Sequence, residues 1–478
     1  MKPDVPSRRA TPLHQHAARA ALIAAAALAA LAAACTGGRH EALAERVDAV
    51  MEPLVASHEF SGAVVLARKG RIIYQRGFGM ANHEAGVPFT PDTPADGGSL
   101  AKTLTAAGIW LLAHEGRVDV DAPVNRYVRE YPFAGTTVRQ LISHSNGLPP
   151  YYEFFDPFFA PDEVRTTKKM LDVVARELPG PAFEPGTRFE YSNFGFDVAA
   201  LLIERVTGRS IAQFLDERFF SRYGMHATFA RPGRFADWPG VRTMGYRWRD
   251  GGWQVVDVFD MEAFIGGSNV YFSVADLSRW ASANSRGPAI APSAFAAGQQ
   301  RTLIDGRPSP LTGLSWYCDD SGNRCYNTGN INAFHGLAYW DRDRIEAVAF
   351  ISNSAMSPWA TITLQRNLVT VLAGETAEIG PPPEFMAFDA AATAALAGNW
   401  FAEELGEVTI SATGPGLRLR VDAGLEFDMF QVSREIFYVP GMDYWIGFTG
   451  VDAPSAMHLR SMFVDAVATV QPRAQDAR

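Results

Sequence analysis

The sequence predicts an α+β protein: an α/β sandwich with a central antiparallel sheet and a helix-rich insert, followed by a small all-β barrel-like domain. Three observations support this fold class. β-rich segments occur near residues 60–80 and again at 312–352, helical patterns dominate residues 99–300, and short alternating runs fill residues 389–478. The 478 residues, 47% of them apolar, suffice for roughly two to three domains with a sizeable core.

Residues 1–34 are predicted to be a signal peptide. Basic residues precede an almost unbroken Ala/Leu run over 20–34, which has the length of a signal-peptide core and is too short to span a bilayer comfortably. Small residues stand immediately before Cys35, as in the lipoprotein signals that this segment resembles. We expect export to the periplasm or cell envelope, with membrane anchoring through a lipid on Cys35 or, alternatively, ordinary cleavage.

The mature domain, residues 35–380, is expected to begin with a helix and a hairpin. Apolar residues at three- and four-residue spacing mark one face of a helix over 40–57. Two β-rich runs, 62–68 and 71–76, are separated only by Lys69-Gly70, the spacing of a tight hairpin. The sheet therefore starts early in the chain.

The insert and the later strands have their own signals. Helices are predicted over 99–115 and 193–207, each followed by Gly, and Ser273 with Asp276 suggests a capping box. Strand patterns return at residues 313–317, 326–328, 336–340 and 345–351, followed by a helix over 359–372. We expect the early and late strands to share one antiparallel sheet flanked by the first and last helices.

The C-terminal part is expected to be a separate β domain. Three consecutive prolines begin a stiff linker over residues 381–388. Alternating runs with Gly, Pro and Asp turns between them then predict a barrel or sandwich over 389–478. Trp400, Tyr438, Trp445 and Phe448 are expected to fill its core rather than to bind a ligand.

Composition excludes several classes of function. The net charge is −9 and no long basic run appears after the first 20 residues, so nucleic acid is not expected as a partner. The ten histidines are scattered and no metal-binding spacing occurs, so a metal is not expected, and the chemistry inferred below needs no cofactor. In an exported protein, Cys318 and Cys325 flank a turn and could form a disulfide that closes a hairpin, or could remain free thiols. The sequence gives no indication of an oligomeric state.

Three short motifs carry the candidate chemistry. Ser99 and Lys102 share one face at the start of a predicted helix, where free N–H groups and the helix dipole stabilise a developing oxyanion. A buried Lys can take the proton of a neighbouring hydroxyl. Tyr191-Ser-Asn193 and Asn327-Thr-Gly329 follow, the latter on a predicted strand. Taken alone, Ser-x-x-Lys is a weak signal; the ordered set is not.

The set resembles the serine β-lactamase and penicillin-binding-protein superfamily, specifically its class C β-lactamase-like branch, here with a C-terminal lipocalin-like β domain. The likeness covers roughly residues 42–353. It extends to connecting segments in the family's order, at residues 60–67, 76–81, 141–149, 203–208 and 266–277.

The resemblance implies a role for each motif residue. Ser99 would be the acylated nucleophile, Lys102 its proton partner and Tyr191 the hydroxyl that relays the proton to the leaving group. Asn193 would position Lys102 and the substrate. His144 is expected to be structural rather than a base.

The third motif would edge the cleft. Asn327, Thr328 and Gly329 would bind substrate, and the backbone N–H groups of Ser99 and Asn330 would form the oxyanion hole. His335-Gly336 is a rival for this motif, but Asn327 keeps the family's spacing to Asp341.

Two departures from the family pattern bear on the substrate. Asn327 replaces a Lys or His, so the cation that pairs with a substrate carboxylate is missing. Losing this cation lowers the affinity for β-lactams or peptide C-termini by about one to two orders of magnitude. The second departure is the segment before the nucleophile, where residues 95–98 are Ala-Asp-Gly-Gly. Compared with the family's usual segment, this one leaves more room near Ser99 and places an acid there. The aromatic segment 151–159 is expected either to rim the cleft or to pack on the insert.

These features predict an exported serine hydrolase that acts through a Ser99 acyl-enzyme on an ester, a D-amino-acid amide or a peptide. A β-lactamase or penicillin-binding DD-peptidase is the alternative within the same chemistry. A catalytically silent cell-envelope binding protein is the alternative from another class. Either enzymatic reading implies a small-molecule or peptide substrate.

Overall fold

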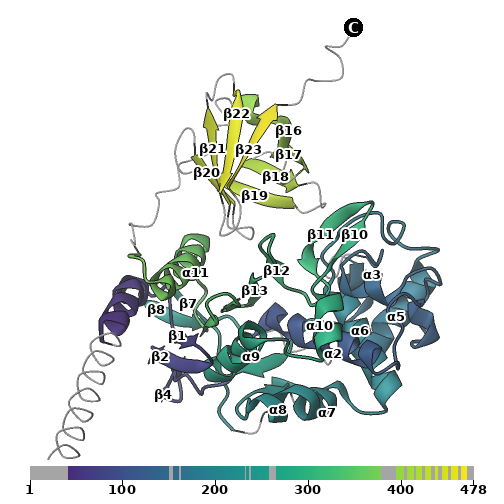
Figure 1. Cartoon of the computed structure of the whole chain (residues 1–478), viewed down its shortest axis with the longest axis horizontal. Helices are drawn as coiled ribbons and strands as arrows, with labels where there is room; N and C mark the ends of the chain where they lie inside the picture. Colours follow the sequence, from purple (N-terminus) through teal and green to yellow (C-terminus); the bar gives the residue numbers. More distant parts are fainter. Residues whose placement is uncertain are drawn as a thin grey trace, which may run out of the picture.

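The computed structural model describes residues 41–149, 154–160, 163–231, 233–235, 238, 240–257, 265–377, 394–402, 406–413, 416–421, 426–431, 436–439, 444–449, 454–460 and 465–470. The predicted signal peptide with Cys35 and the linker 381–388 lie outside these residues. Figure 1 shows a large α/β part and, above it in that view, the β domain in yellow and green.

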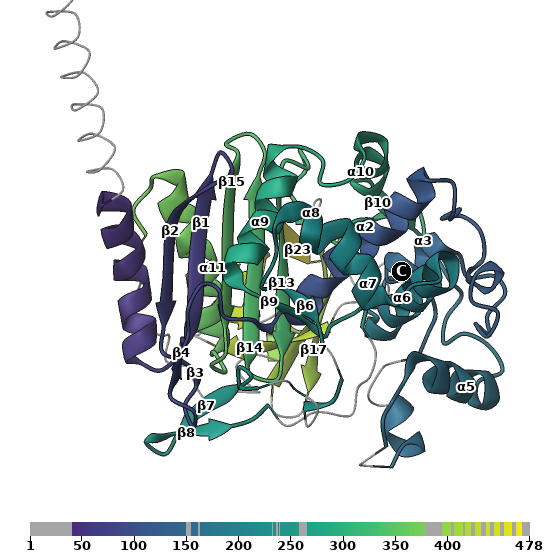
Figure 2. The ribbon, with the colours of Figure 1, turned by 90° about the horizontal axis from the view of Figure 1, so that it is seen from below.

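An eight-stranded antiparallel sheet forms the centre of the α/β part. Its strand order is β10-β11-β12-β13-β14-β15-β1-β2. The strands are β1 (Gly62–Arg68), β2 (Arg71–Phe78), β10 (Arg301–Ile304), β11 (Arg307–Thr312), β12 (Tyr317–Cys318), β13 (Arg324–Ile331), β14 (Phe334–Asp341) and β15 (Glu346–Ser352). The pairing of β1 with β15, Gly62 opposite Ser352, joins the early and late strands. The predicted shared sheet is confirmed (Figure 2).

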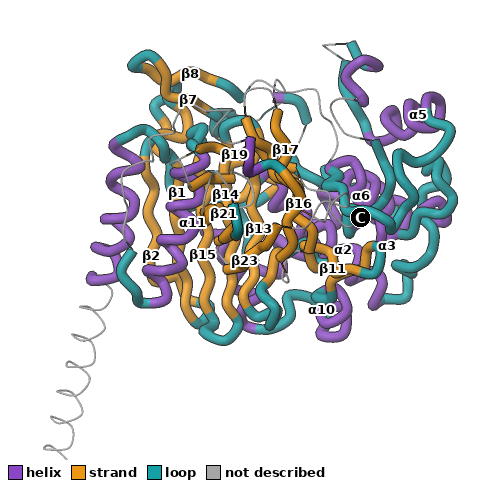
Figure 3. Tube along the Cα trace, turned by 90° about the horizontal axis from the view of Figure 1, so that it is seen from above, coloured by secondary structure: helices purple, strands orange, loops and turns teal. Residues whose placement is uncertain are grey.

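Two apolar cores cover the two faces of this sheet. On one face the first helix, over residues 41–56, and α11 (Pro358–Ala373) pack against side chains of β1, β14 and β15. On the other face lies the larger core, to which α2 (Ala101–His114), α6 (Asn193–Thr207) and α9 (Val274–Arg286) contribute. Figure 3, which looks onto the sheet, shows α11 over the strands, the first helix beside β2 at one edge and helices of the insert at the other. The predicted sandwich is therefore present.

The insert also contains shorter elements. Its other helices are η1 (Gly98–Leu100), η2 (Val124–Arg126), α3 (Val138–Ile142), η3 (Asp156–Phe158), α5 (Thr167–Glu177), α7 (Ile211–Leu215), η4 (Asp216–Phe220), α8 (Ser221–Tyr223) and α10 (Pro292–Gly298). Three short strands precede the insert: β3 (Met80–Asn82), β4 (Val87–Pro88) and β5 (Ala95–Asp96). Those within it are β6 (Phe229–Ala230), β7 (Tyr246–Arg249), β8 (Gly252–Val255) and β9 (Val270–Phe272). Among these, β5 and β6 both pair with β9, which ties the segment before Ser99 to residues 270–272.

Two local predictions need correction. Residues 313–317 were expected to form a strand, but β11 ends at Thr312 and β12 begins at Tyr317, because the chain turns through Ser315 at φ +63°. The capping box at Ser273 is half present. Ser273 accepts the Asp276 N–H, but the Asp276 carboxylate instead accepts the N–H of Ala227, so it stabilises a tertiary contact rather than the helix start.

The C-terminal domain is a closed barrel. Its strands are β16 (Gly398–Ala402), β17 (Gly406–Thr413), β18 (Gly416–Val421), β19 (Glu426–Gln431), β20 (Ile436–Val439), β21 (Tyr444–Thr449), β22 (Ala456–Arg460) and β23 (Asp465–Val470), with η6 (Ala394–Leu396) before them. Pairing of β16 with β23 closes the ring. Trp400 and Phe448 lie in an apolar core of its own, as predicted, whereas the side chains of Tyr438 and Trp445 lie outside the described part of the structure. In the described part of the chain, no helix has the length and apolarity needed to cross a membrane.

Candidate active site

A sharp turn places Ser99 at the start of α2. β5 leads into Gly97 and Gly98, and Gly98 has φ +51°, a left-handed conformation that a side chain disfavours. The 3-10 turn η1 then carries Ser99 directly into α2, where Lys102 lies one helical turn further along. The geometry brings the predicted Ser and Lys onto one face.

Lys102 is fully buried beside the nucleophile. Its Nζ lies 3.1 Å from Ser99 Oγ, 2.7 Å from Asn193 Oδ1 and 2.7 Å from the carbonyl oxygen of Gly267. Asn193 is the first residue of α6, and the second motif thus meets the first, as the resemblance implied. The Gly267 carbonyl is a partner that sequence reasoning missed, although its segment was noted.

Tyr191 completes the group. Its hydroxyl donates to Ser99 Oγ at 2.8 Å. Burial raises the pKa of Tyr191 to about 12, and the bond to Ser99 opposes that rise. Tyr191 is 37% exposed, so the residue lies at the protein surface. At neutral pH this group keeps its proton.

His144 holds Tyr191 in place. The two rings are stacked, with centroids 4.3 Å apart. The backbone on both sides of Tyr191 is anchored to the same residue: Glu190 N–H donates to the His144 carbonyl, and Ser192 N–H donates to His144 Nδ1. Burial lowers the pKa of His144 well below its usual value. A neutral, fully buried ring fits the structural role predicted for it.

The third motif approaches Ser99 through its backbone. A Cβ placed on Gly329 would lie 1.9 Å from the Gly97 carbonyl oxygen, and one on Gly98 would lie 3.1 Å from Asn330 N. Only glycines permit strand β13 and the nucleophile turn to come this close. The backbone N–H groups of Ser99 and Asn330, the predicted oxyanion hole, therefore lie on adjacent segments.

The side chains of Asn327 and Thr328 lie on opposite faces of strand β13. Asn327 is only 5% exposed and its amide donates to the Ser315 carbonyl, so it is engaged with the protein rather than presented to a substrate. Thr328 lies opposite Leu337, on the sheet face away from Gly329 because side chains alternate along a strand. His335, the rival for this motif, lies on the next strand, opposite Asn330.

Two further features belong to the hairpin of β12 and β13. Tyr317 on β12 stacks on Tyr326 at 5.3 Å, and its pKa is raised by burial and by Tyr191 nearby. No spacing signal in the sequence pointed to it. The predicted disulfide is confirmed: Cys318 and Cys325 are bonded and lie directly opposite each other on β12 and β13.

The aromatic segment 151–159 is partly described. Residues 151–153 lie outside the described residues. Phe155 is fully buried and packs edge-on against Phe194 of α6, with centroids 5.0 Å apart. Phe158 is 37% exposed. For Phe155, packing on the insert is therefore the correct alternative.

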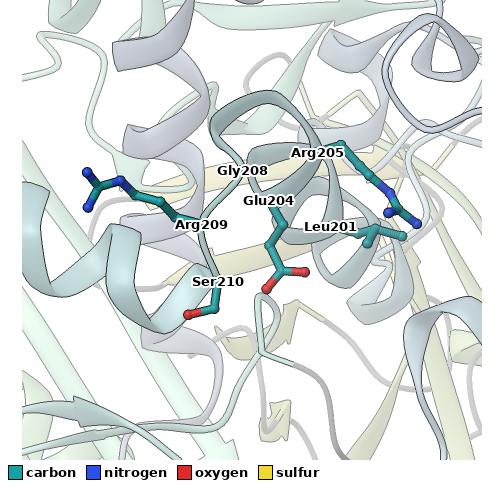
Figure 4. A pocket seen from close by; sticks show the side chains of 6 residues that line it. All are labelled: Leu201, Glu204, Arg205, Gly208, Arg209 and Ser210. Carbon is teal, nitrogen blue, oxygen red and sulfur yellow. The ribbon is translucent and has the colours of Figure 1, made fainter.

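No competing centre stands out. Among the described residues, no group of three or more His, Cys, Asp or Glu side chains is arranged to hold a metal ion. A hollow at the α6–α7 corner, lined by Leu201, Glu204, Arg205, Gly208, Arg209 and Ser210, lies at the opposite end of α6 from Asn193 (Figure 4). Its Glu204 already accepts the Ile211 N–H, and Arg205 pairs with Glu130.

Comparison with known families agrees with this geometry. A family model described as Beta-lactamase matches residues 47–370, more than half of the chain. The chain belongs to the beta-lactamase family. This family groups hydrolases of one fold, and the matched range contains all of the motif residues described above.

Similar proteins span several activities within the beta-lactamase family. Penicillin-binding protein 4* of Bacillus subtilis (strain 168) is 31% identical over 184 residues, which cover 38% of this chain and 41% of that protein. Esterase EstB of Burkholderia gladioli is 31% identical over 214 residues, covering 41% of this chain and 54% of that protein. The chain thus matches about half of these relatives' lengths.

Solved structures extend the likeness in fold. An octameric penicillin-binding protein homologue from Pyrococcus abyssi has a TM-score of 0.60 at 19% identity, covering 89% of this chain and 99% of that chain. SurE has a TM-score of 0.58 at 21% identity, covering 91% of this chain and 99% of that chain. At these identities the likeness shows the fold alone.

Proposed function

We propose that this protein is a serine hydrolase that works through an acyl-enzyme at Ser99. The observation that carries the proposal is the meeting of three groups from two distant segments. Lys102 Nζ and the Tyr191 hydroxyl both lie within hydrogen-bond distance of Ser99 Oγ, at 3.1 and 2.8 Å. This is the nucleophile-and-base geometry that covalent catalysis requires.

Lys102 is placed to act as the base. Two of its polar neighbours, Asn193 Oδ1 and the Gly267 carbonyl, only accept hydrogen bonds. A neutral amine satisfies both with its two N–H groups and directs its lone pair at the Ser99 hydroxyl. Full burial withdraws the Lys102 amine from water.

During acylation, the net result is the transfer of one proton from the Ser99 hydroxyl to the leaving group. Ser99 Oγ attacks the substrate carbonyl as its proton passes to Lys102, and the N–H groups of Ser99 and Asn330 stabilise the oxyanion. Tyr191, which keeps its proton at neutral pH, protonates the leaving group as the ester or amide bond breaks. The proton on Lys102 restores the Tyr191 hydroxyl. Water repeats the sequence on the acyl-enzyme and releases the acid.

The substrate we propose is an ester or a neutral amide, including D-amino-acid amides and peptides. The Asn327 amide carries no charge and is already bonded to the Ser315 carbonyl, so it offers no cation to a substrate carboxylate. A β-lactamase or penicillin-binding DD-peptidase is the second candidate, supported by the likeness to Penicillin-binding protein 4*. We also propose export, with a lipid on Cys35 as the membrane anchor.

A fluorophosphonate probe tests the proposal directly. The full chain is expected to take up one equivalent of probe at Ser99. Ser99→Ala should abolish labelling while retaining the thermal unfolding midpoint of the wild type. Ser293→Ala, at an exposed serine on α10, is the matched control and should label fully. Folded wild-type protein that is not labelled would instead favour a silent binding protein.

A substrate panel separates the two enzymatic candidates. We expect fast turnover of short-chain nitrophenyl esters and slow or absent turnover of a chromogenic cephalosporin. A labelled penicillin that acylates Ser99 and stays for hours would favour the penicillin-binding role.

A further inference from the structure

A buried charge cluster borders the nucleophile turn. Asp96 lies on β5 and is 6% exposed. In the antiparallel pairing of β5 with β9, its backbone lies opposite Tyr271. The charged side chains near its carboxylate are Asp257, Arg231 and Arg242. Arg242 forms an ion pair with Asp257, and the two side chains are 10% and 2% exposed. The proposed reaction uses none of these groups directly.

Asp96 contacts the turn that carries the nucleophile. Its Oδ1 accepts the Gly98 N–H at 2.8 Å, and the preceding N–H, of Gly97, donates to the Val270 carbonyl at 3.0 Å. The next N–H along the chain is that of Ser99, the first oxyanion donor. The Asp96 carboxylate thus holds the peptide unit immediately before that donor.

The same cluster reaches the second donor. Asn332 lies two residues beyond Asn330 in the β13–β14 turn, and its Nδ2 donates to Asp257 Oδ1 at 3.2 Å. Asp257 forms an ion pair with Arg242, and its negative charge repels that of Asp96. Asp96 therefore holds one backbone segment of the oxyanion hole, and the neighbouring Asp257–Arg242 pair contacts the other.

We propose that Asp96 is a positioning residue for the hydrolytic reaction, whose ionised carboxylate holds the Gly98 N–H and so aims the Ser99 N–H at the developing oxyanion. Protonation of this carboxylate weakens the bond, because a charged acceptor binds an N–H more strongly than a neutral one. This inference rests on the proposed function at Ser99.

The surroundings of Asp96 cause its carboxyl group to ionise near neutral pH. Burial raises the pKa of Asp96 to about 7; the Gly98 N–H, Arg231 and Arg242 oppose the rise, and Asp257 adds to it. Tyr271, which faces the same cluster, has a pKa raised well above its usual value by burial and by Asp96, so it stays neutral in this range. Activity is therefore expected to rise with pH through about pH 7 as Asp96 ionises.

The test compares pH profiles of kcat for an ester substrate. Asp96→Asn keeps the shape and an acceptor oxygen but cannot titrate. We expect kcat at pH 8 to fall about tenfold with little change in KM, and the rise near pH 7 to disappear. Asp96→Ala removes the acceptor, and kcat should fall about 10²-fold. Asp257→Asn removes a negative neighbour, so the rise should move to lower pH.

Three outcomes decide the matter. Wild-type protein must first label at Ser99 with the fluorophosphonate; failure there overturns the proposed function. If the wild type labels and folded Asp96→Asn keeps the wild-type pH profile, only the role of Asp96 is refuted. If kcat falls but the rise near pH 7 remains, the carboxylate does not act through its ionisation and the inference fails. Thermal unfolding at each pH establishes that the variants are folded.

Discussion

At the scale of single residues, the division of work around Ser99 follows from which group keeps its proton. Burial raises the pKa of Tyr191 to about 12, so the phenol is a proton donor at neutral pH. In the proposed reaction, Lys102, which contacts two acceptors and the seryl oxygen, is therefore the base. Adjacent groups in different surroundings thus take opposite roles.

Replacing Tyr191 by Phe should therefore slow ester hydrolysis about 10²- to 10³-fold, the usual cost of losing a general acid. Fluorophosphonate labelling rate and kcat both measure the effect. Tyr317→Phe removes a hydroxyl from a nearby ring and is the control, expected to stay within about threefold of the wild type. Equal losses in the two variants would contradict the role of Tyr191. Because the Tyr191 pKa is about 12, wild-type activity should show no decline from its ionisation up to pH 10.

Asp96 also predicts how stability depends on pH. Its pKa is about 7 in the folded protein against 3.8 for the free group, so between these values the folded state binds more protons than the unfolded state. The free energy of unfolding should consequently fall as pH rises from about 4 to about 7. Asp96→Asn lacks this dependence, so its unfolding midpoint should rise relative to that of the wild type as the pH increases over the same range. A constant difference between the two midpoints would argue against a raised pKa.

At the scale of elements, the β12–β13 hairpin matters because it carries Tyr317 and the backbone of Gly329 and Asn330. The Cys318–Cys325 bond closes it at the end away from the site. Gln299 Nε2 contacts both sulfur atoms at 3.3 Å, which ties the hairpin to the end of α10. The pairing of β12 with β13 extends over only two residue pairs, so the covalent bond supplements few hydrogen bonds.

Replacing both cysteines by Ser should lower the free energy of unfolding by about 2 to 3 kcal/mol, the chain-entropy value for so short a loop. Urea unfolding of the oxidised wild type and of the double variant measures this difference. The reduced wild type is the matched control and should resemble the double variant. An unchanged midpoint in both would show that the hairpin is held by its other contacts alone.

At the scale of the whole molecule, the barrel and the hydrolase part have separate cores. The barrel core is formed by residues from Leu396 onward, whereas both cores of the α/β part end before residue 378. The described contacts of Ser99, Lys102 and Tyr191 all come from the α/β part. The barrel interior is filled by its own apolar side chains, including Trp400 and Phe448.

Calorimetry of the full chain should accordingly show two unfolding transitions. A chain ending at Ala377 should retain fluorophosphonate labelling at Ser99 and lose the transition of the barrel. A single transition, or loss of labelling in the shortened chain that remains folded, would show that the barrel supports the active site.

Local signals predicted much of this architecture. The tight Lys69-Gly70 turn and helix 193–207 depend on short-range preferences, and the structure has both where the sequence placed them. The strand expected at 313–317 was wrong because a left-handed Ser315 interrupts it, and no residue-level preference announces that conformation. The side chain of Asn327 could not be placed from the sequence either, since its partner is a carbonyl twelve residues away.

The sequence by itself determined the fold class, the strand and helix periods, the order of the motifs and the family resemblance, because these depend on hydrophobic patterning and on residues close along the chain. Only the tertiary structure decided which atoms meet. The Gly267 carbonyl on Lys102, the His144 ring against Tyr191 and the Asp96 cluster beside Ser99 join segments far apart in the chain. Such contacts, and the pKa values they set, depend on burial and three-dimensional distance, which no local pattern encodes.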